Sequence, residues 1–171
     1  AALHGQVLRR AVELAETRLQ RAPALEALGT HLLDAQQATD AALDNYRQAL
    51  RIFVEEGQTE PARALAERLL ALSPEDAETA AVLVQLAFSG GDMSAANAHF
   101  DALAQVDAQR AQTLLQELEP AAIRAGQVGE LLNWLERLLW QGATSGTVDS
   151  RSLLLQKATW LGTYADRLRE A

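Results

Sequence analysis

Few residues in this sequence have the types and spacing that chemistry requires. The chain contains 3 histidines and no cysteine, so a disulfide framework, a reactive thiolate and a zinc site with cysteine ligands are all excluded. His4, His31 and His99 have no second histidine at ligand spacing on their own predicted helices, and we expect them to be structural. Gly90 and Gly91 lack the lysine and hydroxyl residue of a phosphate-binding loop and are predicted to form a turn.

One pair of basic residues has a spacing that suits binding. Arg47 and Arg51 are one helical turn apart and can hold a carboxylate through charge-assisted hydrogen bonds. The alternative is that Arg47 pairs with Asp44, and Arg51 with Glu55, in surface ion pairs worth about a few tenths of a kcal/mol each. No pair of carboxylates, nucleophile or metal-ligand cluster stands out in the sequence, so we expect no enzymatic activity, no cofactor and no bound metal.

The composition indicates an all-α protein. Hydrophobic residues make up 49% of the chain but aromatic residues only 5%, and small helix formers are abundant. No apolar run approaches the roughly 18 residues of a membrane span, so we expect no membrane insertion. A net charge of −8 and a sequence pI near 4.9 repel polyanions, which argues against direct binding of nucleic acid.

The segment 43–76 is predicted to form two amphipathic helices joined by a turn. Gly57 stands where the first helix must end, because glycine adopts the positive φ of a helix C-terminal cap without a steric penalty. Pro61 fits the first turn of the second helix, where its missing N–H needs no partner, and Pro74 ends that helix. Neither helix can bury its apolar stripe without a neighbour.

The same pattern recurs downstream. A shift of 34 residues carries Gly57 to Gly91, a further shift of 35 carries Gly91 to Gly126, and the apolar positions are refilled in kind. In 43–76 the pattern reads Y-x2-AL-x2-F-x3-G-x4-A-x3-A-x2-LL-x3-P. It resembles the tetratricopeptide repeat (TPR), a helix-turn-helix unit of about 34 residues.

The resemblance implies a right-handed superhelix of stacked antiparallel helical hairpins, with about nine helices in all. We expect a single TPR-like domain over 1–171. Its parts are a helical lead-in over 1–42, repeats over about 43–76, 77–110 and 112–145, and a C-terminal helix over 148–169. The register of the lead-in is open, because Leu28 and Gly29 also fit the first helix of a repeat.

In the TPR family the first helices of the hairpins line a concave groove that binds peptides or partner helices. The usual groove positions fall in this chain on Asp44, Arg47, Arg51, Val54, Glu78, Ala81, Gln85, Phe88, Thr113, Gln116, Ile123 and Arg124. The lysine and asparagine pattern of TPR proteins that clamp a C-terminal carboxylate is absent. The resemblance therefore implies a scaffold that binds a peptide or a partner protein in the groove.

The periodicity also predicts the other helices and their ends. They are expected over 2–20, 22–37, 75–89, 92–106, 108–125 and 127–141. Pro120 lies inside one of them, and proline removes a backbone hydrogen bond at a cost of about 3 kcal/mol, so we expect a kink or break at Glu119. Asp92 is placed to cap the helix that follows it, and the run 142–147 is predicted to be a loop.

The C-terminal helix has two apolar faces in the sequence. One face contains Leu154, Ala158, Leu161, Ala165 and Leu168, and the other contains Leu153, Trp160 and Tyr164. The end of a helical solenoid should be polar outside, so the second face predicts a further repeat, a partner, or a homodimer formed through Leu153, Trp160 and Tyr164. The alternative is that the helix lies across the preceding helix and buries both faces.

Two classes of function follow from these observations. The first is a protein-binding scaffold, which we expect to be bacterial and cytoplasmic, or periplasmic if a signal segment has been removed. The second is a regulatory or sensor domain of a larger transcription or signalling protein. The sequence does not begin with methionine, so we expect it to be part of a longer protein whose neighbouring domains would distinguish the two.

Overall fold

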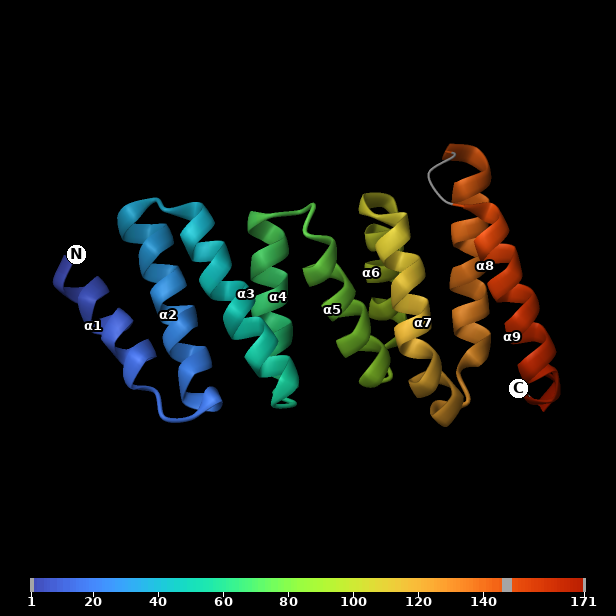
Figure 1. Ribbon diagram of the computed structural model, residues 1–171, viewed down its shortest axis with the longest axis horizontal. Coiled ribbons are helices and arrows are strands. Elements are labelled where there is room, and N and C mark those ends of the chain that lie inside the picture. The colour runs from blue at the N-terminus through green and yellow to red at the C-terminus, as the bar shows by residue number, and fades with distance from the viewer. Residues whose placement is uncertain (1, 146–148, 171) are drawn as a thin grey trace. The chain divides into compact units, whose positions relative to one another are not determined.

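The computed structural model describes residues 2–145 and 149–170, which contain nine helices and no strand. The expected all-α fold is confirmed (Figure 1). The helices are α1 (Ala2–Leu14), α2 (Arg18–Gln36), α3 (Thr39–Glu55), α4 (Thr59–Leu72), α5 (Ala77–Ser89), α6 (Met93–Val106), α7 (Ala108–Ala125), α8 (Val128–Ser145) and α9 (Ser150–Glu170).

Three of the turns between helices have the same backbone structure. Gly57, Gly91 and Gly126 have φ values of 67°, 76° and 69°, which confirms the three predicted glycine turns. At the first turn, the N–H of Gln58 donates to the carbonyl of Phe53 at 2.8 Å and that of Gly57 donates to the carbonyl of Val54 at 3.1 Å. Such a pair of bonds defines the Schellman motif, which ends a helix on a left-handed residue. The other two turns have the equivalent pairs of bonds. At the second turn, Asp92 donates to Ala87 and Gly91 to Phe88; at the third, Gln127 donates to Ala122 and Gly126 to Ile123.

The apolar positions of the three repeats also have equivalent environments. The second helix of each hairpin has three apolar positions that are fully buried in every repeat. The first is occupied by Ala62, Ala96 and Leu131, the second by Ala66, Phe100 and Leu135, and the third by Leu69, Leu103 and Leu138. The side chains differ in volume from repeat to repeat although the position stays buried. The 34- and 35-residue shifts seen in the sequence are therefore shifts between structurally equivalent residues.

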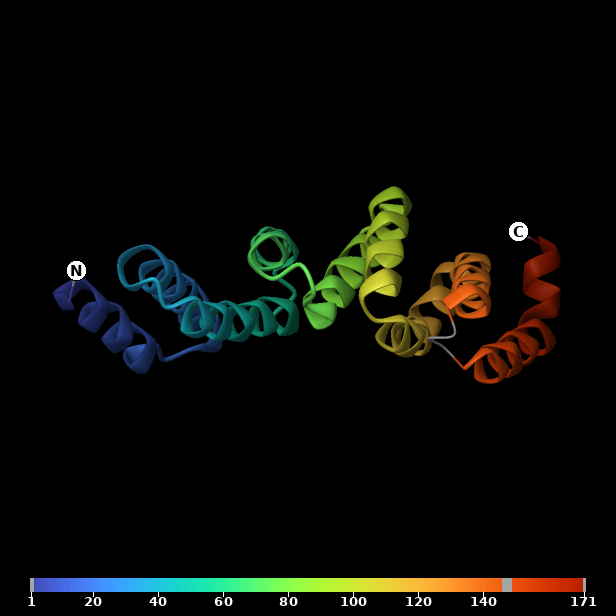
Figure 2. The same ribbon diagram turned by 90° about the horizontal axis from the view of Figure 1, so that it is seen from above.

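The chain divides into two compact units, Ala1–Thr79 and Ala80–Ala171. In the first unit, α1 packs on α2, α2 on α3 and α3 on α4 (Figures 1 and 2). Tyr46 of α3 is fully buried there. Its hydroxyl is 3.1 Å from that of Thr30 on α2, and the guanidinium of Arg68 lies 4.8 Å from its ring centroid. One aromatic side chain thus ties α2, α3 and α4 together.

In the second unit, α6 packs on α7 and α8, α7 on α8, and α8 on α9. Trp134 of α8 is the largest fully buried side chain. Its ring stacks on Phe100 at a centroid distance of 4.6 Å and lies edge to face with Phe88 at a centroid distance of 5.8 Å. Its indole N–H donates to Asn97 at 2.6 Å, so this buried polar group is satisfied.

The predicted bounds of the first two helices are wrong. The first helix ends at Leu14 instead of residue 20, and α2 begins at Arg18, four residues before its predicted start at residue 22. Thr17 explains the break. It has an extended backbone, and its side chain accepts a hydrogen bond from the N–H of Gln20 at 3.2 Å. Threonine at this N-cap position satisfies one of the free N–H groups of the first turn, and Pro23 then lies inside α2.

A kink or break is predicted at Glu119, and the break does not occur, since α7 continues through Pro120 to Ala125. Proline deprives only the carbonyl four residues earlier of its donor, and Gln116 is exposed to water that can replace it. The predicted loop over 142–147 is wrong for its first part, because α8 continues to Ser145. Gly142 is buried within α8, and positions 146 and 147 lie outside the described residues.

Candidate protein-binding surfaces

The first predicted binding residues lie on α3, where Arg47 is engaged within the chain. Its Nε donates to Asp76 at 2.8 Å, and its Nη1 lies 3.6 Å from Asp44 on the same helix. Asp76 is in the turn between α4 and α5, and its side chain is only 8% exposed. The ion pair therefore fastens α3 to the start of α5, and Arg47 is committed to this contact.

Asp76 also caps α5, because its second oxygen accepts from the backbone N–H of Thr79 at 3.1 Å. Burial alone would raise the pKa of Asp76. The hydrogen bond from Thr79 and the charge of Arg47 outweigh that effect, so the pKa of this carboxyl lies below its ordinary value. A carboxylate held in this way is part of the fold of the first unit.

Arg51 is more accessible than Arg47. The alternative surface pair between Arg51 and Glu55 does not form, because Glu55 instead accepts from Arg18 of α2 at 2.6 Å. Arg51 is exposed and has no ion-pair partner among the residues that the structure describes. On α3, therefore, Arg51 is the basic group that remains available to a partner.

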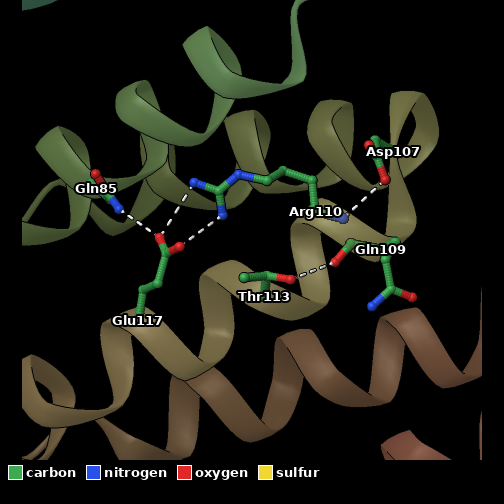
Figure 3. A network of polar contacts seen from close by, with 6 residues as sticks. All are labelled: Gln85, Asp107, Gln109, Arg110, Thr113 and Glu117. Atoms are coloured by element: carbon green, nitrogen blue, oxygen red, sulfur yellow. Dashed lines mark hydrogen bonds and ion pairs between the residues drawn. The ribbon is translucent and has the colours of Figure 1, made fainter. Parts of the chain in front are cut away.

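The second unit carries a polar network between α5 and α7 (Figure 3). Glu117 of α7 accepts from the amide of Gln85 on α5 at 3.0 Å and from both terminal nitrogens of Arg110 at 3.2 and 3.3 Å. The backbone N–H of Arg110 donates to Asp107, which caps α7. A bidentate arginine fixes the carboxylate in position, so this surface is ordered before any partner arrives.

The predicted groove residues of the second unit have different environments. Ala81 and Phe88 are buried in the core, whereas Thr113, Gln116 and Arg124 are exposed. Glu78, at the end of the first unit, is also exposed, and Val54 and Ile123 are half-buried.

Arg110 and Glu117 were missed by sequence reasoning. Their spacing of seven residues places them two turns apart on one face of α7, which is a detectable signal. Their shared contact with Gln85 depends on how α5 packs against α7.

Another polar surface lies between α6 and α8, on the second helices of two hairpins. Its groove has a volume of about 740 Å³ and is lined by Asp101, Gln105, Asn133, Glu136, Arg137, Trp140 and Gln141. Arg137 contacts Asp101 at 2.6 Å and also donates to Asn97. Glu136 accepts from Lys157 of α9 at 2.6 Å. The charges of the groove are therefore largely compensated within the chain.

The face of α9 that contains Leu153, Trp160 and Tyr164 points into the chain. Leu153 and Trp160 are buried, and the hydroxyl of Tyr164 donates to Glu119 of α7 at 2.7 Å. The amide of Gln112, also on α7, donates to Ser152 at 3.0 Å. The residues predicted for contact between copies thus lie on the inward face of α9, where Tyr164 bonds to α7, and the face that contains Leu154 and Leu161 is the exposed one.

His4 and His31 are close in space although they are far apart in sequence. Their rings meet edge to face at a centroid distance of 5.1 Å, between α1 and α2. His31 is buried, and its Nε2 has no hydrogen-bond partner. Among the residues described, no three histidine or carboxylate side chains are grouped so that they could hold a metal ion.

Comparison with protein-family models gives no match for this chain, and comparison with curated proteins gives none either. Over the described ranges, no helix combines the length and the apolar character that crossing a membrane requires.

Proposed function

We propose that this chain is a TPR-like helical-repeat scaffold that binds a peptide or a partner protein. The observation that carries the proposal is the threefold recurrence of one hairpin turn, at Gly57, Gly91 and Gly126, with the same pair of backbone hydrogen bonds each time. Repeated hairpins present successive first helices on a common side, and repeat proteins use such surfaces for binding. The right-handed superhelical stacking that the resemblance implies is part of this proposal.

The accessible polar groups on α3 and α7 support a binding role. Arg51 on α3, and Gln116 and Arg124 on α7, are exposed. Gln85, Arg110 and Glu117 form a fixed network beside the α7 residues. Ordered groups of this kind bind with a smaller entropy penalty than mobile ones. We propose that Arg51 and Arg124 provide charge-assisted contacts to carboxylates of the partner.

The test is an affinity capture with the whole chain from an extract of the source cells, compared with the variants Arg51→Glu and Arg124→Glu. Both arginines are exposed, so the variants are expected to fold. We expect the dissociation constant of a captured partner to rise at least about tenfold, which corresponds to about 1.4 kcal/mol. The matched control is Arg9→Glu, the same change of charge on exposed α1, which should leave binding unchanged.

The proposal fails if captured proteins bind all three variants and the wild type equally. It also fails if Arg9→Glu weakens binding as much as the two other variants, because the effect would then come from the net charge of the chain rather than from these surfaces.

A further inference from the structure

The outward face of α9 is apolar. Leu154, Leu155 and Leu161 leave 55%, 61% and 43% of their surface exposed, and Ala158 between them is also exposed. One exposed leucine on a protein surface needs no explanation. Three large apolar side chains within two turns of one helix form a patch of the kind that marks an interaction site.

The hydroxyl groups of the exposed threonines of α9 are already satisfied. The hydroxyl of Thr159 donates to the carbonyl of Leu155 at 2.9 Å, and that of Thr163 donates to the carbonyl of Thr159 at 2.8 Å. An apolar surface that covers this face would therefore leave neither hydroxyl without a partner, and the usual penalty for burying polar groups would be avoided.

Gly162 has no evident role in the chain's own fold. A Cβ built at this position meets no atom within 4 Å, yet glycine inside a helix is less stable than alanine by about 1 kcal/mol. Gly162 lies one helical turn after Ala158, so these two small residues form a strip of low helix surface that runs beside Leu154 and Leu161. A low surface of this kind lets a second helix approach closely.

We propose that the α9 of a second copy of this chain covers the face, in an antiparallel helix pair. A two-fold contact requires a surface that is complementary to itself. This face has both projecting leucines and a low surface over Ala158 and Gly162 that can receive the leucines of the other copy. The spacing of Leu154, Ala158 and Leu161 is that of the seam along which two helices interlock their side chains.

The position of Arg151 favours the antiparallel orientation. Arg151 is exposed near the start of the helix, and a parallel pair would place two copies of it side by side. An antiparallel pair separates them by most of the length of α9, which removes the like-charge repulsion. Lys157 is held by Glu136 of its own chain and adds no unpaired charge at the seam.

The test is the mass of the whole chain measured by sedimentation equilibrium over about a hundredfold range of concentration, because the dimer fraction of a reversible pair rises with concentration. We expect a monomer at low concentration and twice that mass at high concentration. Leu154→Glu and Leu161→Glu should each raise the dissociation constant of the dimer at least about tenfold.

Two further variants separate loss of the interface from loss of the fold. Gly162→Leu fills open space in the isolated chain. At a concentration that keeps the wild type monomeric, its helical circular dichroism and thermal midpoint should therefore match or exceed those of the wild type, while at high concentration its dimer is lost. Val106→Glu replaces an exposed apolar residue on α6 and should leave the dimer intact. A wild type that stays monomeric at every concentration overturns the proposal, and so does a dimer that tolerates Gly162→Leu and both leucine changes.

Discussion

Gly29 of α2 lies directly against the ring of Tyr46 on α3. A Cβ built on Gly29 would stand 2.7 Å from Cε1 of Tyr46, 2.9 Å from Cδ1 and 3.1 Å from the carbonyl oxygen of Ala42. The ring has little room to move away, because Tyr46 is fully buried and its hydroxyl contacts Thr30. The absence of a side chain at Gly29 is therefore what allows α2 and α3 to pack closely.

We expect Gly29→Ala to lower the free energy of unfolding by about 1–3 kcal/mol, the usual cost of overpacking a core. The clash should outweigh the gain in helix propensity, which is about 1 kcal/mol. Chemical denaturation measures the difference. The matched control is Gly162→Ala at a concentration low enough to keep the chain monomeric, which should raise stability by about 0.5–1 kcal/mol. Equal stability of Gly29→Ala and the wild type would show that the contact can relax.

The glycine turns allow a second test, which depends on the backbone alone. Gly91 has φ 76°, and a Cβ built there meets no atom within 4 Å. We therefore expect Gly91→Ala to destabilise the fold by about 1–2 kcal/mol, the cost of the left-handed conformation for an L-residue. Gly91→Asn should lose less stability than Gly91→Ala, because asparagine adopts positive φ more readily than alanine. If thermal unfolding shows no difference between the wild type and these two variants, φ at this turn is not positive in solution.

The turns could be predicted from the sequence because they depend on nearby residues. Glycine at the end of an apolar stripe has few alternatives, and Asp92 was likewise recognised as a cap, which the structure confirms with a 3.0 Å bond from the N–H of Ala95. The break at Thr17 is equally local. It was missed because the apolar pattern continues across it, so periodicity alone favoured one long helix.

Contacts between helices could not be predicted in this way. The two apolar faces of α9 were both visible in the sequence, but nothing in the periodicity says which one meets α7 and α8. The link from Gln85 to Glu117, and the contact of His4 with His31, likewise join helices that are separate in the sequence. Spacing along one helix cannot reveal partners on another.

The lowered pKa of Asp76 predicts a dependence of stability on pH. Because its folded-state pKa lies below the unfolded value, the carboxylate stabilises the fold fully above the unfolded pKa of about 3.9. That contribution is lost as the pH falls through the lower, folded-state pKa. We expect Asp76→Asn to be less stable than the wild type at neutral pH, with the difference shrinking as the solution is acidified below about pH 4.

Unfolding by urea at several pH values measures this difference. Asp34 is exposed, so Asp34→Asn is a suitable control. If the free energies of unfolding of Asp76→Asn and the wild type differ by the same amount at every pH, the charge of Asp76 does not contribute to stability.

The two arginines on α3 should differ in their effect on stability although they are one turn apart. Arg47→Ala removes the partner of a largely buried carboxylate, but about half of the arginine side chain is exposed to screening water, so we expect a loss of only about 0.5–1 kcal/mol. Arg51→Ala should change stability by less than about 0.5 kcal/mol, as surface substitutions usually do.

A double-mutant cycle with Arg47→Ala and Asp76→Asn isolates the energy of the ion pair from the other contacts of each residue. We expect a coupling energy of about 0.5 kcal/mol or more from denaturation curves at neutral pH, and little coupling between Arg51→Ala and Asp76→Asn. Additive effects of Arg47→Ala and Asp76→Asn would contradict the assignment of Arg47 to the fold, and would leave its guanidinium, like that of Arg51, available to a bound partner.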